Sequence, residues 1–173
     1  EYLGRSGMIE SNPVLAILLM LVAAMLVAAT TAILSERIAY RPLRRAPRLV
    51  PLITAIGVSY FLQYTARGLF GSGVEAFPNV PALQGTVALG PLTMQRSQIA
   101  VFIATAVLLL ILWVLVSKTK VGRAIRSVAE DKDAAALMGV DVDRTIAISF
   151  AVGGIMAGAA GVMYGLVFRQ VAF

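Results

Sequence analysis

The chain has 173 residues and a net charge of +6; 59% of its residues are hydrophobic and its mean hydropathy is +0.85. A soluble domain of this size would lack the polar surface to cover so much apolar material, so the composition excludes a soluble protein and predicts a single-domain polytopic membrane protein. The absence of cysteine and histidine excludes disulfides, thiolate chemistry, zinc sites of the usual type and histidine proton relays.

The basic residues gather in two places. Five arginines lie within residues 35–48, and six bases lie within residues 118–144. This is the pattern of positive-inside membrane topology and of contact with anionic headgroups. No basic stripe is interleaved with aromatic residues, so a nucleic-acid surface is disfavoured.

The first apolar run covers residues 13–34 and contains no charge. Asn12 and Pro13 form a helix start signal, and the run reaches about 33 Å as a helix, enough to cross the hydrocarbon core. Glu1 begins the sequence without a cleavable signal before this run, and Phe173 ends it just after another apolar run. We therefore expect the chain to be a piece of a longer protein.

Residues 35–48 are expected to form a loop, because Pro42 and Pro47 break any helix that runs through them. The loop carries five arginines against one glutamate. A topogenic loop held inside by its arginines is the favoured interpretation, and binding to the acidic surface of a partner is the alternative.

The second apolar run, residues 49–66, has a polar flank. Polar groups at membrane depth must face protein or a wet cavity rather than lipid. The polar side chains of this run either anchor the helix at the interface and form interhelical hydrogen bonds, or line a substrate path. Both interpretations stay open. The candidate substrate-path residues are Thr54, Ser59, Tyr60 and Gln63, with Tyr64 on the same flank.

Residues 67–97 are poor in charge and rich in glycine and proline, which predicts an ordered outer loop or a cap over a cavity. Within it, Thr86–Leu89 and Leu92–Met94 flank Gly90-Pro91 and could form a small hairpin.

Residues 98–117 are the third predicted span, with Trp113 near the inner interface.

Residues 118–144 hold eleven of the chain's 24 Asp, Glu, Lys and Arg residues. Gly122–Ala129 and Asp133–Met138 are predicted to be two short helices, the first with an apolar stripe formed by Val121, Ile125 and Val128. The nearly neutral charge balance suits docking against another protein better than lying on anionic lipid. A solvated linker between two spans is the alternative.

Capping residues divide this segment. Either Asp131 or Asp133 can cap the second short helix, and Gly139 stands where a C′ glycine would end it. Asp143 is predicted to cap the last span from the aqueous side.

The last span, residues 145–168, carries small residues at a mean step of 3.5, which places them on one side of a helix. Such a packing seam lets another helix backbone approach closely, whereas a pore-lining strip of exposed backbone is the alternative. Its six residues are Ala147, Ala151, Gly154, Gly158, Gly161 and Gly165.

These observations predict an all-α fold: a polytopic transmembrane bundle of about four helices with a small outer loop or hairpin. The base-rich loops 35–48 and 118–144 are expected in the cytoplasm, and loop 67–97 outside.

Two segments carry a resemblance to a known family. Residues 133–139, DAAALMG, fit acidic-Ala-Ala-x-x-x-Gly and are similar to the coupling loop of bacterial ABC importer permeases. TKVGRAIRSVAEDKDAAALMGVDVDRTI and ERIAYRPLRRAPRLVPLITAIGVSYFLQ resemble the high-affinity branched-chain amino acid permease family (LivH type). This chain departs from the wider importer class in one respect. There, an Ile-x-Leu-Pro element follows the glycine at a set distance, whereas no Leu-Pro occurs here and Ile148 and Ser149 occupy that region instead.

The resemblance implies a multi-pass subunit of the bacterial inner membrane. The implied partners are a second, related permease, two cytoplasmic ATPases and a periplasmic binding protein. It also implies that the short helix is a coupling helix that inserts into a groove on the ATPase. The motif residues carried over are Asp133, Ala134, Ala135 and Gly139.

The expected function is therefore transport of branched-chain amino acids, or of amides or urea as in relatives of the family, without an enzymatic activity, cofactor or metal in this chain. No G-x-x-x-x-G-K-[ST] is present, so ATP hydrolysis is expected in a partner. An ATP-independent channel and a structural assembly subunit remain alternatives. An intramembrane enzyme is the weakest one, since the spans hold no paired carboxylates.

Overall fold

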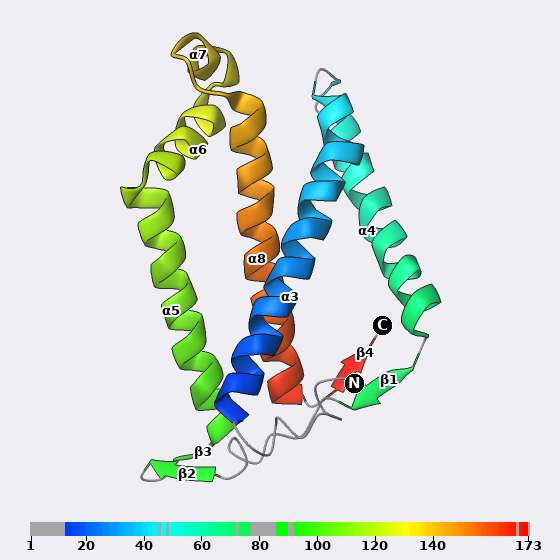
Figure 1. Cartoon of the computed structure of the whole chain (residues 1–173), viewed down its shortest axis with the longest axis vertical. Helices are drawn as coiled ribbons and strands as arrows, with labels where there is room; N and C mark the ends of the chain where they lie inside the picture. Colours follow the sequence, from blue (N-terminus) through cyan, green and yellow to red (C-terminus); the bar gives the residue numbers. More distant parts are fainter. Residues whose placement is uncertain are drawn as a thin grey trace.

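Four long helices dominate the computed structural model of the chain, which describes residues 13–44, 46–47, 49–71, 73–76, 86–89, 92–168 and 170–172. Each is long and apolar enough to cross a membrane. A helix satisfies its own backbone hydrogen bonds, as a hydrocarbon environment requires. The prediction of an all-α bundle with four spanning helices is confirmed. The four helices are α3 (Pro13–Ser35), α4 (Leu49–Phe70), α5 (Arg96–Lys118) and α8 (Val142–Phe168), seen in Figure 1.

Three of these helices extend further into polar sequence than expected. α4 continues past Ala66 to Phe70, α5 begins two residues before Gln98, and α8 begins three residues before Thr145. The added turns contain charged residues, whose long side chains can reach water from a helix end. Hydropathy marks the apolar part of a helix, and the helix itself is longer.

The prediction of a loop directly after residue 34 is wrong. The chain remains helical through a π-helical turn (Glu36–Tyr40) and a 3-10 turn (Arg41–Leu43). The wide turn is closed by the Arg41 backbone N–H, which donates to the Glu36 carbonyl five residues earlier. Pro42 stands in the first turn of the 3-10 segment, where its missing N–H removes no hydrogen bond.

The connections between the helices gather at two opposite ends of the bundle (Figure 1). At one end, here called the polar end, lie residues 36–44 and the short helices α6 (Lys120–Glu130) and α7 (Lys132–Leu137). The two predicted short helices are thus confirmed: α6 extends beyond its predicted bounds at both ends, and α7 is displaced by one residue.

The other end, here called the strand end, holds two pairs of short antiparallel strands. β2 (Thr86–Leu89) pairs with β3 (Leu92–Gln95), which confirms the predicted hairpin. β1 (Val74–Ala76) pairs with β4 (Gln170–Ala172), so the segment that follows α4 lies beside the segment that follows α8. Nothing in the local sequence predicts this second pairing.

The helices do not pack equally. α3 and α8 lie against each other along much of their length, and α5 contacts α8 through a bond from the Thr105 hydroxyl to the Met163 sulfur at 3.7 Å. The buried apolar residues in this region are Ala16, Ala29, Ala159, Val162 and Met163. α4 is different, because none of its side chains is buried, although every residue of the helix is described. It meets the remainder of the bundle mainly near the π-helical turn (Figure 1).

Candidate functional site

The polar end is built around α7, whose start is fixed by Asp131. One carboxylate oxygen of Asp131 accepts hydrogen bonds from the backbone N–H groups of Asp133, at 2.8 Å, and Ala134, at 3.1 Å. The sequence left the cap open between Asp131 and Asp133, and the structure selects Asp131. Asp133 lies in the first turn, where its charge interacts favourably with the helix dipole.

The end of α7 is a Schellman motif centred on Gly139. The Gly139 N–H donates to the Ala136 carbonyl and the Val140 N–H donates to the Ala135 carbonyl, both at 3.0 Å. Gly139 has φ +83°, a left-handed conformation that side chains with a Cβ disfavour. No described atom lies within 4 Å of where its Cβ would be, so the need for glycine comes from the backbone and not from space.

The predicted motif residues of α7 have unequal surroundings. Ala135 is buried, with 4% of its surface exposed, whereas Asp133 and Ala134 are exposed. Leu137 and Met138 are 89% and 84% exposed, the highest values among the large hydrophobic side chains of the described residues. Sequence reasoning did not single these two out. The signal would have been two apolar residues directly after an alanine-rich turn within the most charged segment of the chain.

A tight corner joins α5 to α6. The Thr119 hydroxyl caps α6 by accepting from the Gly122 N–H at 3.0 Å, and the Arg126 guanidinium donates to the Val116 carbonyl at the end of α5. A Cβ on Gly122 would collide with the Leu115 and Val116 carbonyls. α6 is therefore held at a fixed angle to α5.

The predicted apolar stripe of α6 is buried to differing degrees. Val128 is buried and Ile125 is partly buried, while Val121 is exposed.

The prediction that Asp143 caps the last span is wrong. Asp141 is the cap: its carboxylate accepts from the Arg144 N–H at 2.9 Å, and its carbonyl accepts from the Thr145 N–H at 3.0 Å. Asp143 lies one residue inside α8 and pairs with Arg44, and with Arg41 at 3.5 Å. Arg44 also pairs with Glu36, which is only 1% exposed.

The structure divides the six residues of the packing seam. Where a Cβ would stand on Gly154, the Ala28 carbonyl oxygen is 2.7 Å away, and on Gly158 the Ala24 carbonyl oxygen is 2.5 Å away. These two glycines therefore lie directly against the backbone of α3. Gly165 is buried, and Ala147 and Ala151 are half-buried. Gly161 is exposed, with no described atom within 4 Å of its Cβ position, so it does not contact α3, and its place in the seam stays a prediction.

The polar flank of α4 is exposed. The Gln63 amide donates to the Ser59 hydroxyl at 3.2 Å, and the rings of Tyr60 and Tyr64 stack with centroids 6.4 Å apart. Ser59, Tyr60 and Gln63 line an open pocket of about 400 Å³. Thr54 does not belong to that pocket, and its hydroxyl donates to the Val50 carbonyl of its own helix at 2.9 Å.

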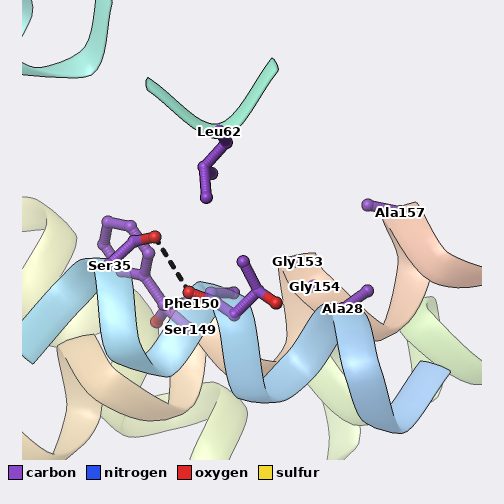
Figure 2. A pocket seen from close by; sticks show the side chains of 10 residues that line it. Ala28, Ser35, Leu62, Ser149, Phe150, Gly153, Gly154 and Ala157 are labelled. Atoms are coloured by element: carbon purple, nitrogen blue, oxygen red, sulfur yellow. Dashed lines mark hydrogen bonds between the residues drawn. The ribbon is translucent and has the colours of Figure 1, made fainter. Parts of the chain in front are cut away.

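A larger open cavity of about 630 Å³ lies over α3 and α8, with Leu62 of α4 on its far side (Figure 2). Its lining is almost entirely apolar. The two serines in the wall satisfy their hydroxyls within their own helices: Ser35 donates to the Thr31 carbonyl at 2.8 Å and Ser149 to the Thr145 carbonyl at 3.0 Å. The sequence did not reveal this cavity, because it arises from the separation of α4 from the packed pair.

The sequence is similar to known transport proteins. Residues 3–173 match the profile of a family described as "Branched-chain amino acid transport system / permease component". Over 133 residues, the chain is 38% identical to the high-affinity branched-chain amino acid transport system permease protein LivH of Escherichia coli (strain K12), and equally to LivH of Salmonella typhimurium. Over 136 residues, it is 37% identical to the permease protein BraD of Pseudomonas aeruginosa, covering 76% of this chain.

These matches cover only part of the relatives. The aligned region is 75% of this chain but 43% of LivH, and 44% of BraD, so the chain spans less than half of the relatives it matches. No solved structure matches the chain. The four apolar helices and the permease relatives together describe a multi-pass membrane protein.

Proposed function

Because the chain belongs to the family of branched-chain amino acid transport system permease components, we propose that it is part of the membrane-spanning subunit of an ATP-binding-cassette importer. The importer carries branched-chain amino acids across the bacterial inner membrane. The observation that carries the proposal is the family match over residues 3–173, joined to a helical hairpin of α6 and α7 at the polar end of the bundle.

The α6–α7 hairpin supports a coupling role. Leu137 and Met138 are apolar and almost fully exposed, yet they lie in the segment with the highest density of charge, where lipid tails do not cover them. Exposed apolar side chains rimmed by charged residues are typical of a protein-binding surface. This surface binds in a groove on a separate ATPase subunit. Asp133, Ala134, Ala135 and Gly139 shape the helix that enters the groove.

Force applied to α7 has a rigid path into the bundle. Four residues separate the last residue of α7 from the first of α8, and the Schellman motif and the Asp141 cap hold most of their backbone hydrogen bonds. On the other side, the corner at Gly122 and Arg126 fixes α6 to α5. A displacement of α7 therefore moves α5 and α8 instead of being absorbed by a flexible link.

The charge distribution supports the orientation. Eleven bases lie within residues 35–48 and 118–144, and base-rich connections are typical of the cytoplasmic side, where the ATPase would bind. The strand end then faces outward, toward a periplasmic binding protein that delivers the substrate.

The polar flank of α4 is proposed to face the substrate path, completed by a second permease subunit. Polar side chains at membrane depth face protein or water and not lipid. Ser59, Tyr60 and Gln63 share one pocket and supply hydroxyl and amide groups that can bind the amino and carboxyl groups of an amino acid. Thr54, which is turned to its own backbone, contributes to the helix and not to this path.

The test is transport by the full-length permease, purified with its ATPase and its partner permease and reconstituted in vesicles with the binding protein. We expect leucine uptake that requires ATP, and none with a hydrolysis-deficient ATPase. Uptake that proceeds equally without ATP would identify a channel instead, and ATP-dependent uptake of an amide or urea but not of leucine would change the substrate class.

A further inference from the structure

An ion-pair network joins three segments at the polar end. Arg44 pairs through one guanidinium nitrogen with Glu36 and through the other with Asp143. Arg41 approaches the second oxygen of Asp143 at 3.5 Å. Glu36 begins the π-helical turn after α3, Arg44 follows the 3-10 turn, and Asp143 lies in the first turn of α8.

The local backbone explains how Arg44 reaches both carboxylates. The π-helical and 3-10 turns keep the chain coiled from Glu36 to Leu43, which returns the Arg44 side chain toward Glu36 at the end of α3. Asp143 is free to take part because Asp141, and not Asp143, caps α8. Residues far apart in the sequence are thereby joined by a single side chain.

Burial makes this network different from an ordinary surface salt bridge. Glu36 is only 1% exposed and Arg44 is largely covered, and a buried carboxylate requires a charged partner. Arg44 is therefore held in place by Glu36, whereas its pairing with the half-exposed Asp143 joins two separate elements. The close α3–α8 contact at Gly154 and Gly158 lies further along α8 and does not fix its first turn.

We propose that Arg44, held by Glu36, is a positioning residue that fastens the first turn of α8 to the α3–α4 connection through Asp143. A displacement of α7 then moves the start of α8 and the end of α3 as one body, so that the motion reaches α4 as well. This inference rests on the proposed function, because it concerns how the motion of the coupling helix is distributed.

The first test measures the link itself and needs no partner protein. The 173 residues contain no cysteine, so spin labels can be attached at Arg37→Cys and Arg144→Cys, two exposed positions beside the network, once any cysteine elsewhere in the full-length permease is replaced by serine. In the full-length permease we expect one narrow distance distribution between the labels. Asp143→Asn should broaden the distance distribution, whereas Asp143→Glu, which keeps a carboxylate, should leave it narrow.

The matched control is Asp141→Asn, which removes the same charge two residues earlier but keeps an efficient helix cap. It should leave the distance distribution narrow. Asp143→Asn leaves the buried Glu36–Arg44 pair in place, so the variant should still fold. It therefore tests the link between Arg44 and Asp143 separately from folding. Equal distributions in Asp143→Asn and the parent protein would overturn the link.

The second test measures how well the motion of α7 is transmitted to the bundle. The measured quantity is the ratio of ATP hydrolysed to substrate carried in the reconstituted transporter. We expect Asp143→Asn to raise this ratio about fivefold or more, the size of a modest coupling free energy, while co-purification with the ATPase is unchanged. Asp143→Glu should restore the ratio and Asp141→Asn should not alter it. A residue that only stabilised the fold would change the yield of the complex and leave the ratio constant.

The outcomes are distinguishable. A broadened distance distribution with an unchanged ratio would overturn the role in transmission. If the unsubstituted transporter shows no ATP-dependent uptake, the proposed function fails and the transmission role fails with it, while the spin-label distances still decide whether the link exists.

Discussion

α8 and α4 are both long apolar helices, yet only one of them is packed. α8 buries seven of its residues, whereas α4 buries none. The difference follows from side-chain size. Glycines at 154 and 158 let the α3 backbone approach α8 closely, while α4 presents leucine, isoleucine and aromatic side chains around its circumference.

The comparison separates two ways in which a membrane helix is positioned. α8 is held by contacts within the chain, which makes it suited to transmit motion. α4 keeps a polar flank without a covering helix among the described residues, which makes it suited to face a partner or a wet path. Substitutions in α8 should therefore change stability most at its contact with α3, and substitutions on the flank of α4 should change it least.

Gly158→Leu should destabilise the bundle by about 3 kcal/mol, because overpacking forces the α3 backbone away from α8. Even the Cβ would lie only 2.5 Å from the Ala24 carbonyl oxygen. The measurement is the free energy of unfolding of the full-length permease in a bilayer mimic. Gly161→Leu, one turn further along, is the matched control and should change it by less than about 0.5 kcal/mol. Similar losses at both positions would mean that α8 is not held at these glycines.

Glu36→Gln should lower the free energy of unfolding by about 2 kcal/mol, the cost of removing a charged hydrogen-bond partner in a buried site. Of its two carboxylate partners among the described residues, Arg44 would keep Asp143, which is half-exposed. The control is Arg37→Gln at the adjacent, exposed position, which should have little effect. If both substitutions were equally mild, the buried pair would not contribute to holding the polar end of α3 against α8.

Gly139→Val should destabilise the end of α7 by roughly 1 to 2 kcal/mol, because a β-branched residue resists the left-handed conformation at φ +83°. Hydrogen exchange of the α7 amides should become faster, and the ATP used per substrate should rise. Gly139→Asn is the control, since asparagine tolerates this conformation and the site has room for it. Normal exchange in the valine variant would show that α7 does not depend on this C-cap.

Local signals in the sequence are sufficient to predict the helices and their ends, but not the contacts between one element and another. Runs without charge predicted the four long helices, and glycine and aspartate at helix ends predicted the limits of α7. The cap of α8 was predicted at the wrong aspartate because Asp141 and Asp143 are equally suitable by residue type. Asp143 instead pairs with Arg44 and Arg41, about a hundred residues away in the chain, and no local pattern reveals such a pairing.

One position of the predicted packing seam lies outside the contact with α3 for a related reason. A mean step of 3.5 places Gly161 on the same face as Gly154 and Gly158, but it does not say how far the partner helix follows that face. α3 lies against the first two glycines and not against the third. In the same way, the π-helical turn after Ser35 and the pairing of β1 with β4 depend on contacts that have no signature in the local residue pattern.

Gln63→Leu should have the smallest effect on stability, less than about 0.5 kcal/mol, because the side chain is exposed and bonds only to Ser59 of its own helix among the described residues. In the reconstituted transporter the same substitution should raise the KM for the amino acid several-fold, since it removes an amide from the proposed path. Thr54→Val is the matched control on α4: its hydroxyl is turned to Val50 and away from the pocket, so both stability and KM should be unchanged. A weaker association with the partner permease at unchanged KM would instead assign the flank of α4 to interhelical bonding, the other interpretation that the sequence left open.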